Sequence, residues 1–100
     1  MEIRTNIDGD TASIAIVGKL SVATVPELEE AIENCSTDVI HFIMELDEME
    51  YISSAGLRVF VSIEKLSQGR GGDMVLRHPN EEVSEVLEMT GLSDVFTIED

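Results

Sequence analysis

Apolar and polar residues alternate along the first part of the chain in the way that is typical of strands. Residues 2–7 alternate, residues 11–18 form a mostly apolar run, and the Asp-Gly-Asp sequence at 8–10 between them favours a tight turn. We therefore predict an antiparallel hairpin whose second strand ends at Gly18.

A helical pattern follows the hairpin. Thr24 with Glu27 three residues later is typical of a capping box, and Pro26 lies in the first turn, where a missing N–H group costs little. The apolar residues that share one face of this helix are Val25, Leu28, Ile32 and Cys35. We predict a first helix that begins near Thr24 and buries Cys35 at the end of its apolar face.

The central part of the chain predicts a strand, a loop and a second helix. Residues 38–46 are a short apolar run with β-branched and aromatic content, which indicates a strand buried on both faces in the middle of a parallel sheet. Residues 47–51, DEMEY, read as a polar loop. Residues 57–66 carry a wide apolar stripe of helical spacing, and the glycines of 67–73 end this helix.

The last third predicts two more strands around a third helix. Residues 73–78 are a strand, Asn80 is placed to cap a helix, and Gly91 suits the left-handed position after that helix. Residues 94–99 form the last strand. The order ββαβαβαβ predicts an α/β fold: a single domain over residues 1–100, with helices packed on a mixed five-stranded sheet. Its crossovers are parallel and right-handed, and the N-terminal hairpin is antiparallel.

Charge and composition exclude several classes of function. The chain has 21 acidic and 6 basic residues and a formal net charge of −15, so a broad electrostatic face for nucleic acid or an anionic membrane is not expected. A single cysteine excludes an internal disulfide framework, and the N-terminus has no signal-peptide pattern. These features predict a cytoplasmic protein.

No pattern for catalysis, metal binding or a cofactor is present. Ser53 and Ser54 lack the glycine of a nucleophile elbow, and His41 and His78 read as a core histidine and a loop histidine. No metal-ligand spacing occurs, and the GRGG sequence at 69–72 precedes a strand rather than a helix, which indicates a turn and not a phosphate-binding loop. We therefore expect a non-enzymatic protein without a cofactor.

The serine pair in YISSAGLRVF, residues 51–60, is the main candidate for a functional site. Either serine could cap the second helix, and this structural role alone would explain one hydroxyl. The pair also follows a buried strand, at the sheet edge where open α/β folds place their sites. Gly56 would let another backbone approach closely, and the free N–H groups of a helix start tolerate a phosphate.

The same stretch resembles the signature of STAS domains, the fold of bacterial anti-sigma factor antagonists. GKLSVATVPELEEAI at 18–32 and GLSDVFTIED at 91–100 resemble two further motifs of this family, so the resemblance covers nearly the whole chain. It implies a phosphorylation switch without catalysis. The family's phosphoserine corresponds to Ser54, and the family's aspartates correspond to Ser21 and Ser53 here.

The resemblance also implies partners. An anti-sigma factor with serine kinase activity would bind the unphosphorylated form, and a phosphoserine phosphatase would restore that form. The residues that the resemblance assigns to the partner surface are Ser21, Thr24, Ser53, Ser54, Ala55, Gly56, Leu57 and Arg58. Two other readings stay open: a stand-alone STAS subunit of a lipid-transport or stress-signalling complex, and a small-molecule or nucleotide-binding module.

Overall fold

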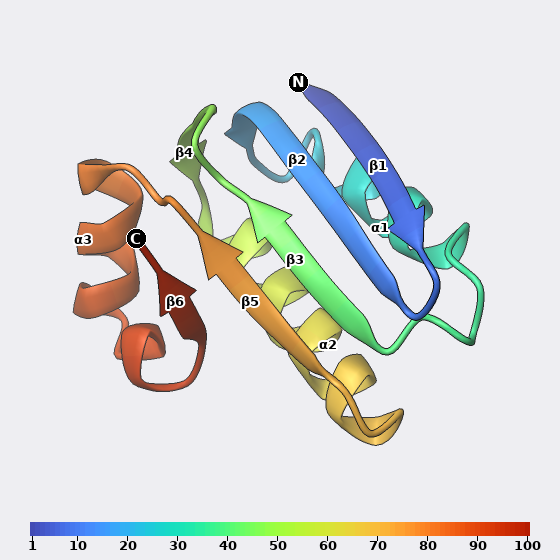
Figure 1. The fold of residues 1–100 in the computed structure, drawn as a ribbon. Coiled ribbons are helices and arrows are strands. Elements are labelled where there is room, and N and C mark those ends of the chain that lie inside the picture. Colours follow the sequence, from blue (N-terminus) through green and yellow to red (C-terminus); the bar gives the residue numbers. More distant parts are fainter.

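Six strands and three α-helices make up the computed structural model, which describes residues 1–100 (Figure 1). The strands are β1 (Glu2–Asp8), β2 (Thr11–Leu20), β3 (His41–Glu45), β4 (Met49–Ile52), β5 (Asp73–Arg77) and β6 (Thr97–Glu99). The helices are α1 (Val25–Glu33), α2 (Ser54–Gly69) and α3 (Glu81–Met89), followed by a short 3₁₀ turn, η1 (Leu92–Asp94). None of these helices is both long enough and apolar enough to span a membrane.

The strands form one mixed sheet in the order β1-β2-β3-β5-β6, with β4 paired to β2. The β1–β2 pair is antiparallel and every other pair is parallel, so the predicted N-terminal hairpin and parallel crossovers are confirmed. Helices α1 and α2 lie behind the sheet in Figure 1, whereas α3 lies beside β4 and β6. The sheet face toward the viewer carries no helix.

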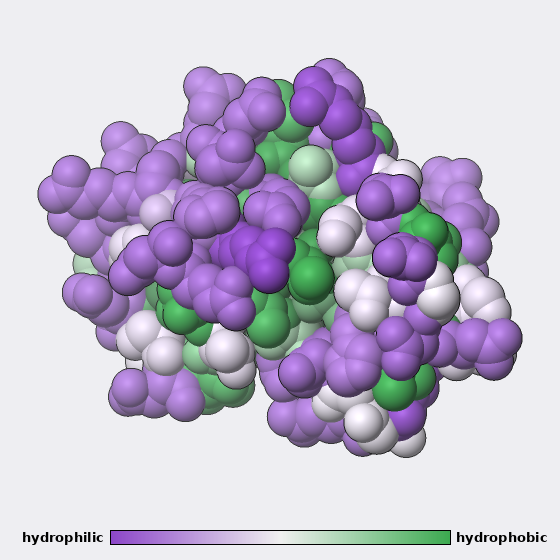
Figure 2. Space-filling model, viewed as in Figure 1, coloured by the Kyte–Doolittle hydropathy of each residue, from purple (hydrophilic) through white to green (hydrophobic).

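The core lies between the sheet and the helices behind it. Phe42 and Met44 of β3 are fully buried, as are their neighbours Met74 and Leu76 of β5. The intervening residues of β3 are only partly buried. The prediction that residues 38–46 form a strand buried on both faces is therefore wrong: the strand begins at 41, and only its alternate residues point into the core. Figure 2 shows hydrophilic residues over most of the open face, with apolar patches between them.

His41 lies on this open face. The sequence had indicated a core histidine, so that prediction is wrong. Its side chain is 38% exposed, and its Nδ1 lies 2.7 Å from a carboxylate oxygen of Asp73. The hydrogen bond with Asp73 raises the pKa of His41, and the charges of Asp73 and Asp10 act in the same direction. His41 thus links the hairpin turn to the start of β5 rather than filling the core.

The segment predicted as a polar loop contains the fourth strand, β4. Strand β2 does not end at Gly18 but continues to Leu20, and its last residues pair with β4 in parallel. The register shifts by one residue between Gly18 and Lys19, which leaves Glu50 as an extra residue in β4. This bulge breaks the alternation of the strand, so no period of two marks it in the sequence.

Candidate partner-binding site

The candidate site lies where β2 and β4 end and α2 begins. Because the two strands are parallel, their carboxyl ends meet at one edge, and the Ser53 N–H donates to the Leu20 carbonyl at 2.9 Å. This bond brings the β2–α1 loop, residues 21–24, next to the serine pair. The two segments that the resemblance assigns to the partner surface therefore lie at the same edge of the sheet.

The two serines have different environments. Ser53 is the N-cap of α2, and its Oγ accepts a hydrogen bond from the Gly56 N–H at 3.3 Å. Ser54 is the first residue of the helix; it is exposed, and its hydroxyl has no hydrogen-bond partner within the chain. The backbone N–H groups of Ser54 and Ala55 also have no acceptor within the chain, as is usual in the first turn of a helix. Ser53 stabilises the helix start, which leaves the Ser54 hydroxyl available.

This division predicts opposite results for two alanine substitutions. We expect Ser53→Ala to lower the free energy of unfolding by about 0.5–1 kcal/mol, because the lost cap is a long hydrogen bond. Ser54→Ala should stay within about 0.5 kcal/mol of the wild type, because its hydroxyl has no partner in the fold. Urea unfolding followed by circular dichroism measures both. A larger loss for Ser54→Ala than for Ser53→Ala would reverse the assignment of the cap.

The β2–α1 loop is held by Thr24, but not through the predicted capping box. The Thr24 side chain makes no capping bond to α1. Its Oγ1 instead donates to the Lys19 carbonyl at 2.9 Å and accepts from the Ser21 N–H at 2.9 Å. The hydroxyl thus closes the loop on itself. Val22, which is 79% exposed, lies at the surface beside the sheet edge that carries Ser53 and Ser54, here called the serine edge.

Gly56 and Leu57, which the resemblance assigns to the partner surface, are buried beneath this edge. Neither residue is therefore accessible for direct contact with a partner. A Cβ at Gly56 would lie 2.8 Å from Ile52 Cγ1 and 2.9 Å from Leu20 Cδ2. The glycine is therefore explained by close packing of the α2 start on the strand ends, not by the approach of another backbone, as the sequence had suggested. Arg58 is exposed and forms no ion pair within the chain.

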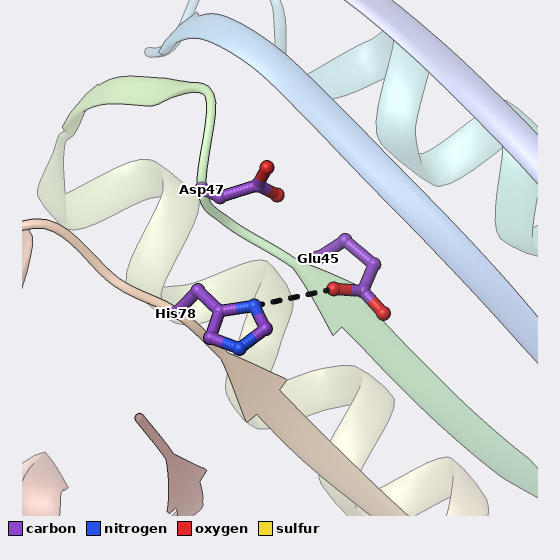
Figure 3. Close-up of side chains that lie close together, drawn as sticks. All are labelled: Glu45, Asp47 and His78. Atoms are coloured by element: carbon purple, nitrogen blue, oxygen red, sulfur yellow. Dashed lines mark ion pairs between the residues drawn. The ribbon is translucent and has the colours of Figure 1, made fainter.

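An open hollow adjoins the serine edge. It is lined by Lys19, Ser21, Glu50, Tyr51, Asn80, Glu81 and Glu82. The carboxylates of the 47–50 segment are not equally close to this hollow. Glu48 lies 3.7 Å from Arg4, and a carboxylate oxygen of Asp47 lies within 4.8 Å of ligand atoms of Glu45 and His78 (Figure 3). Only Glu50 of that segment lines the hollow.

A cluster of potential metal ligands occurs at the end of β3 and β5, although no sequence spacing had indicated one. Ligand atoms of Glu45, Asp47 and His78 lie within 4.8 Å of one another, and Figure 3 shows the His78 ring facing Glu45. The Arg77 guanidinium also pairs with Glu45, at 3.2 Å, and with Glu99, at 2.8 Å. Because cationic Arg77 already compensates Glu45, an ion-pair network accounts for the cluster.

Comparison with known proteins identifies the family. The model of the STAS domain family matches residues 2–100, so the chain belongs to the STAS domain family. The anti-sigma-B factor antagonist of Listeria monocytogenes is 33% identical over 92 residues, which is 91% of this chain and 81% of that protein. A crystal structure from Thermotoga maritima, of a protein assigned as an anti-sigma factor antagonist, is 25% identical. It matches with a TM-score of 0.89 over 98% of this chain and 86% of that one.

The Bacillus cell fate determinant SpoIIAA in its phosphorylated form shares the fold. Its TM-score is 0.77 at 16% sequence identity, over 97% of this chain and 90% of that one. Membership of this family makes the chain a regulatory binding protein rather than an enzyme. The predicted recognition and fold class are thus confirmed, with a sixth strand added to the sheet.

Proposed function

We propose that this chain is an anti-sigma factor antagonist controlled by phosphorylation of Ser54. In its unphosphorylated form it binds an anti-sigma factor with serine kinase activity, which releases the sigma factor. Phosphorylation abolishes the complex, and a phosphoserine phosphatase restores binding. The partner surface comprises the exposed part of the serine edge, including Arg58, together with the β2–α1 loop.

The observation that carries this proposal is the free hydroxyl of Ser54. A kinase needs an accessible hydroxyl, and Ser54 is exposed at the first position of α2 without a partner in the fold. Ser53 is only partly exposed, and its hydroxyl already accepts the capping hydrogen bond. Modification of Ser54 therefore leaves the cap of the helix in place.

The surroundings of Ser54 indicate that the fold tolerates a phosphate on this residue. A phosphoserine adds about 1.5 to 2 negative charges at neutral pH, and the start of a helix stabilises negative charge. Arg58, four residues along α2, is an unpaired cation that can offset part of this charge. Glu48 lies 3.7 Å from Arg4, so of the nearby loop carboxylates Glu50, which lines the adjoining hollow, opposes the phosphate most directly. SpoIIAA, which has the same fold, exists in a phosphorylated form, which is consistent with this expectation.

The experiment that tests the proposal locates the phosphate. The chain is incubated with ATP and the ATP-binding anti-sigma factor kinase from the same genome, and the modified residue is mapped by tandem mass spectrometry. We expect one phosphate, on Ser54, and none in Ser54→Ala.

Ser53→Ala is the matched control, because it removes the neighbouring hydroxyl and keeps Ser54. This variant should still be phosphorylated. A phosphate on Ser53 in the wild type, or full modification of Ser54→Ala, would contradict the assignment.

A further inference from the structure

A shallow apolar groove separates β4 from α3. Tyr51, Ile52, Val83, Val86 and Met89 provide its apolar lining, and Glu82 and Glu85 complete it; its volume is about 180 Å³. Met89 is 85% exposed and Tyr51 is 47% exposed, although both are large and apolar. Two of the five exposed large apolar side chains of the molecule therefore line one groove, a pattern typical of an interaction surface.

The N-terminal end of the groove is fixed by Asn80. The Asn80 Oδ1 accepts from the Val83 N–H at 2.8 Å, which caps α3, and its Nδ2 donates to the Met49 carbonyl at 2.9 Å. The same side chain thus holds the start of α3 against β4. Val83 and Leu87 anchor the helix in the core, so the two elements that form the groove are held in place before a partner binds.

The groove is continuous with the serine edge. Tyr51 and Glu82 line both the groove and the hollow that contains Ser21. Ile52, next to Tyr51 on β4, lies two residues before Ser54 in the chain. A partner that covers the Ser54 edge and the β2–α1 loop can therefore extend across Tyr51 into the groove.

The charges around the groove define the chemistry of its partner. Four carboxylates line the groove and the adjoining hollow: Glu50, Glu81, Glu82 and Glu85. None of them forms an ion pair within the chain, and Lys19 is the only cation that lines this surface. An apolar strip with unpaired carboxylates is complementary to a segment that carries apolar side chains beside lysine or arginine.

We infer that the β4–α3 groove is a second docking surface of the anti-sigma factor partner, and that it receives a basic segment with an apolar face. This inference rests on the proposed function and extends it. Apolar side chains of the partner cover Tyr51 and Met89, while its cations meet Glu82 and Glu85. The groove lies beside the phosphorylation site, so it adds affinity to the unphosphorylated complex without contacting the hydroxyl that is modified.

The test measures binding of the same anti-sigma factor kinase by isothermal titration calorimetry at low and high salt. We expect the double variant Glu82→Lys/Glu85→Lys to bind about tenfold or more weakly and to lose part of the salt dependence. Met89→Ala should weaken binding several-fold with unchanged salt dependence, because it removes apolar contact only. Glu29→Lys/Glu33→Lys on α1 is the control, since it makes the same charge change on exposed residues of another helix.

The outcomes separate this inference from the proposed function. If the groove variants bind within twofold of the wild type while Ser54→Asp has lost binding, the groove inference is overturned and the function stands. An equal loss in the α1 control would assign the effect to net charge and overturn the inference as well. If the wild type does not bind the kinase, both the function and the inference are overturned.

Discussion

Gly72→Ala is expected to lower the free energy of unfolding by about 3 kcal/mol or more, the upper range for overpacking. A Cβ at this position would lie 1.8 Å from the carbonyl oxygen of Ile40 and 2.9 Å from its Cβ. The obstacle is backbone, which no rotamer change can remove. The Ile40 carbonyl also accepts from the Asp73 N–H at 3.1 Å, next to where β3 and β5 begin to pair. Alanine therefore has to separate the two central strands.

Urea unfolding measures this effect, with Gly69→Ala as the matched control. Gly69 ends α2, and a Cβ there meets no atom within 4 Å. Its replacement should leave the stability unchanged or raise it by up to about 1 kcal/mol, because alanine loses less backbone entropy. A Gly72→Ala variant within 1 kcal/mol of the wild type would show that the strands can separate at little cost.

Ser54→Asp is expected to weaken binding of the anti-sigma factor kinase about 100-fold or more, if the proposed function holds. A charge that enters an interface without a partner loses its hydration, and such unpaired charges cost several kcal/mol. The fold itself should be unaffected, because Ser54 is exposed and a carboxylate in the first turn is favourable to the helix. Calorimetric titration measures the affinity, and urea unfolding verifies the fold.

Two controls isolate the position of the charge. Ser54→Ala removes the hydroxyl without adding charge and should bind within about threefold of the wild type. Ser53→Asp adds the same charge one residue earlier, at the N-cap, where aspartate also caps a helix. It should keep binding. Wild-type affinity in Ser54→Asp would exclude this residue as the switch, and equal losses in Ser53→Asp would show that the effect has no positional basis.

The elements that the sequence predicted well are those defined by local interactions. The Asp-Gly-Asp turn sets the hairpin, and Asn80 caps α3 through the hydrogen bond that its position had indicated. The glycines after α2 end it as expected, with Gly71 at a φ of 84°. In each case the determining contacts lie within a few residues, so the sequence contains them directly.

The errors concern contacts between distant segments. Strand β4 was not predicted because it has no alternating pattern in the sequence. Its extra residue, Glu50, is accommodated only through pairing with β2, about thirty residues earlier in the chain. The capping box at Thr24 failed because Lys19 and Ser21 offer backbone groups that compete for the hydroxyl. The prediction that His41 lies in the core is wrong because residues 38–46 are mostly apolar in sequence, whereas helices cover only one face of the sheet.

By itself, the sequence determined the class of fold and the location of the candidate site, since the serine pair and its neighbours form a recognisable motif at a strand–helix junction. Only the tertiary structure decided which serine is free. The Ser53 N–H donates to the Leu20 carbonyl and its Oγ caps α2 at the Gly56 N–H, while the Ser54 hydroxyl forms no hydrogen bond within the chain. The same structure places Tyr51 and Met89, 38 positions apart, in one groove. Such juxtapositions depend on strand pairing and helix packing, which no local pattern encodes.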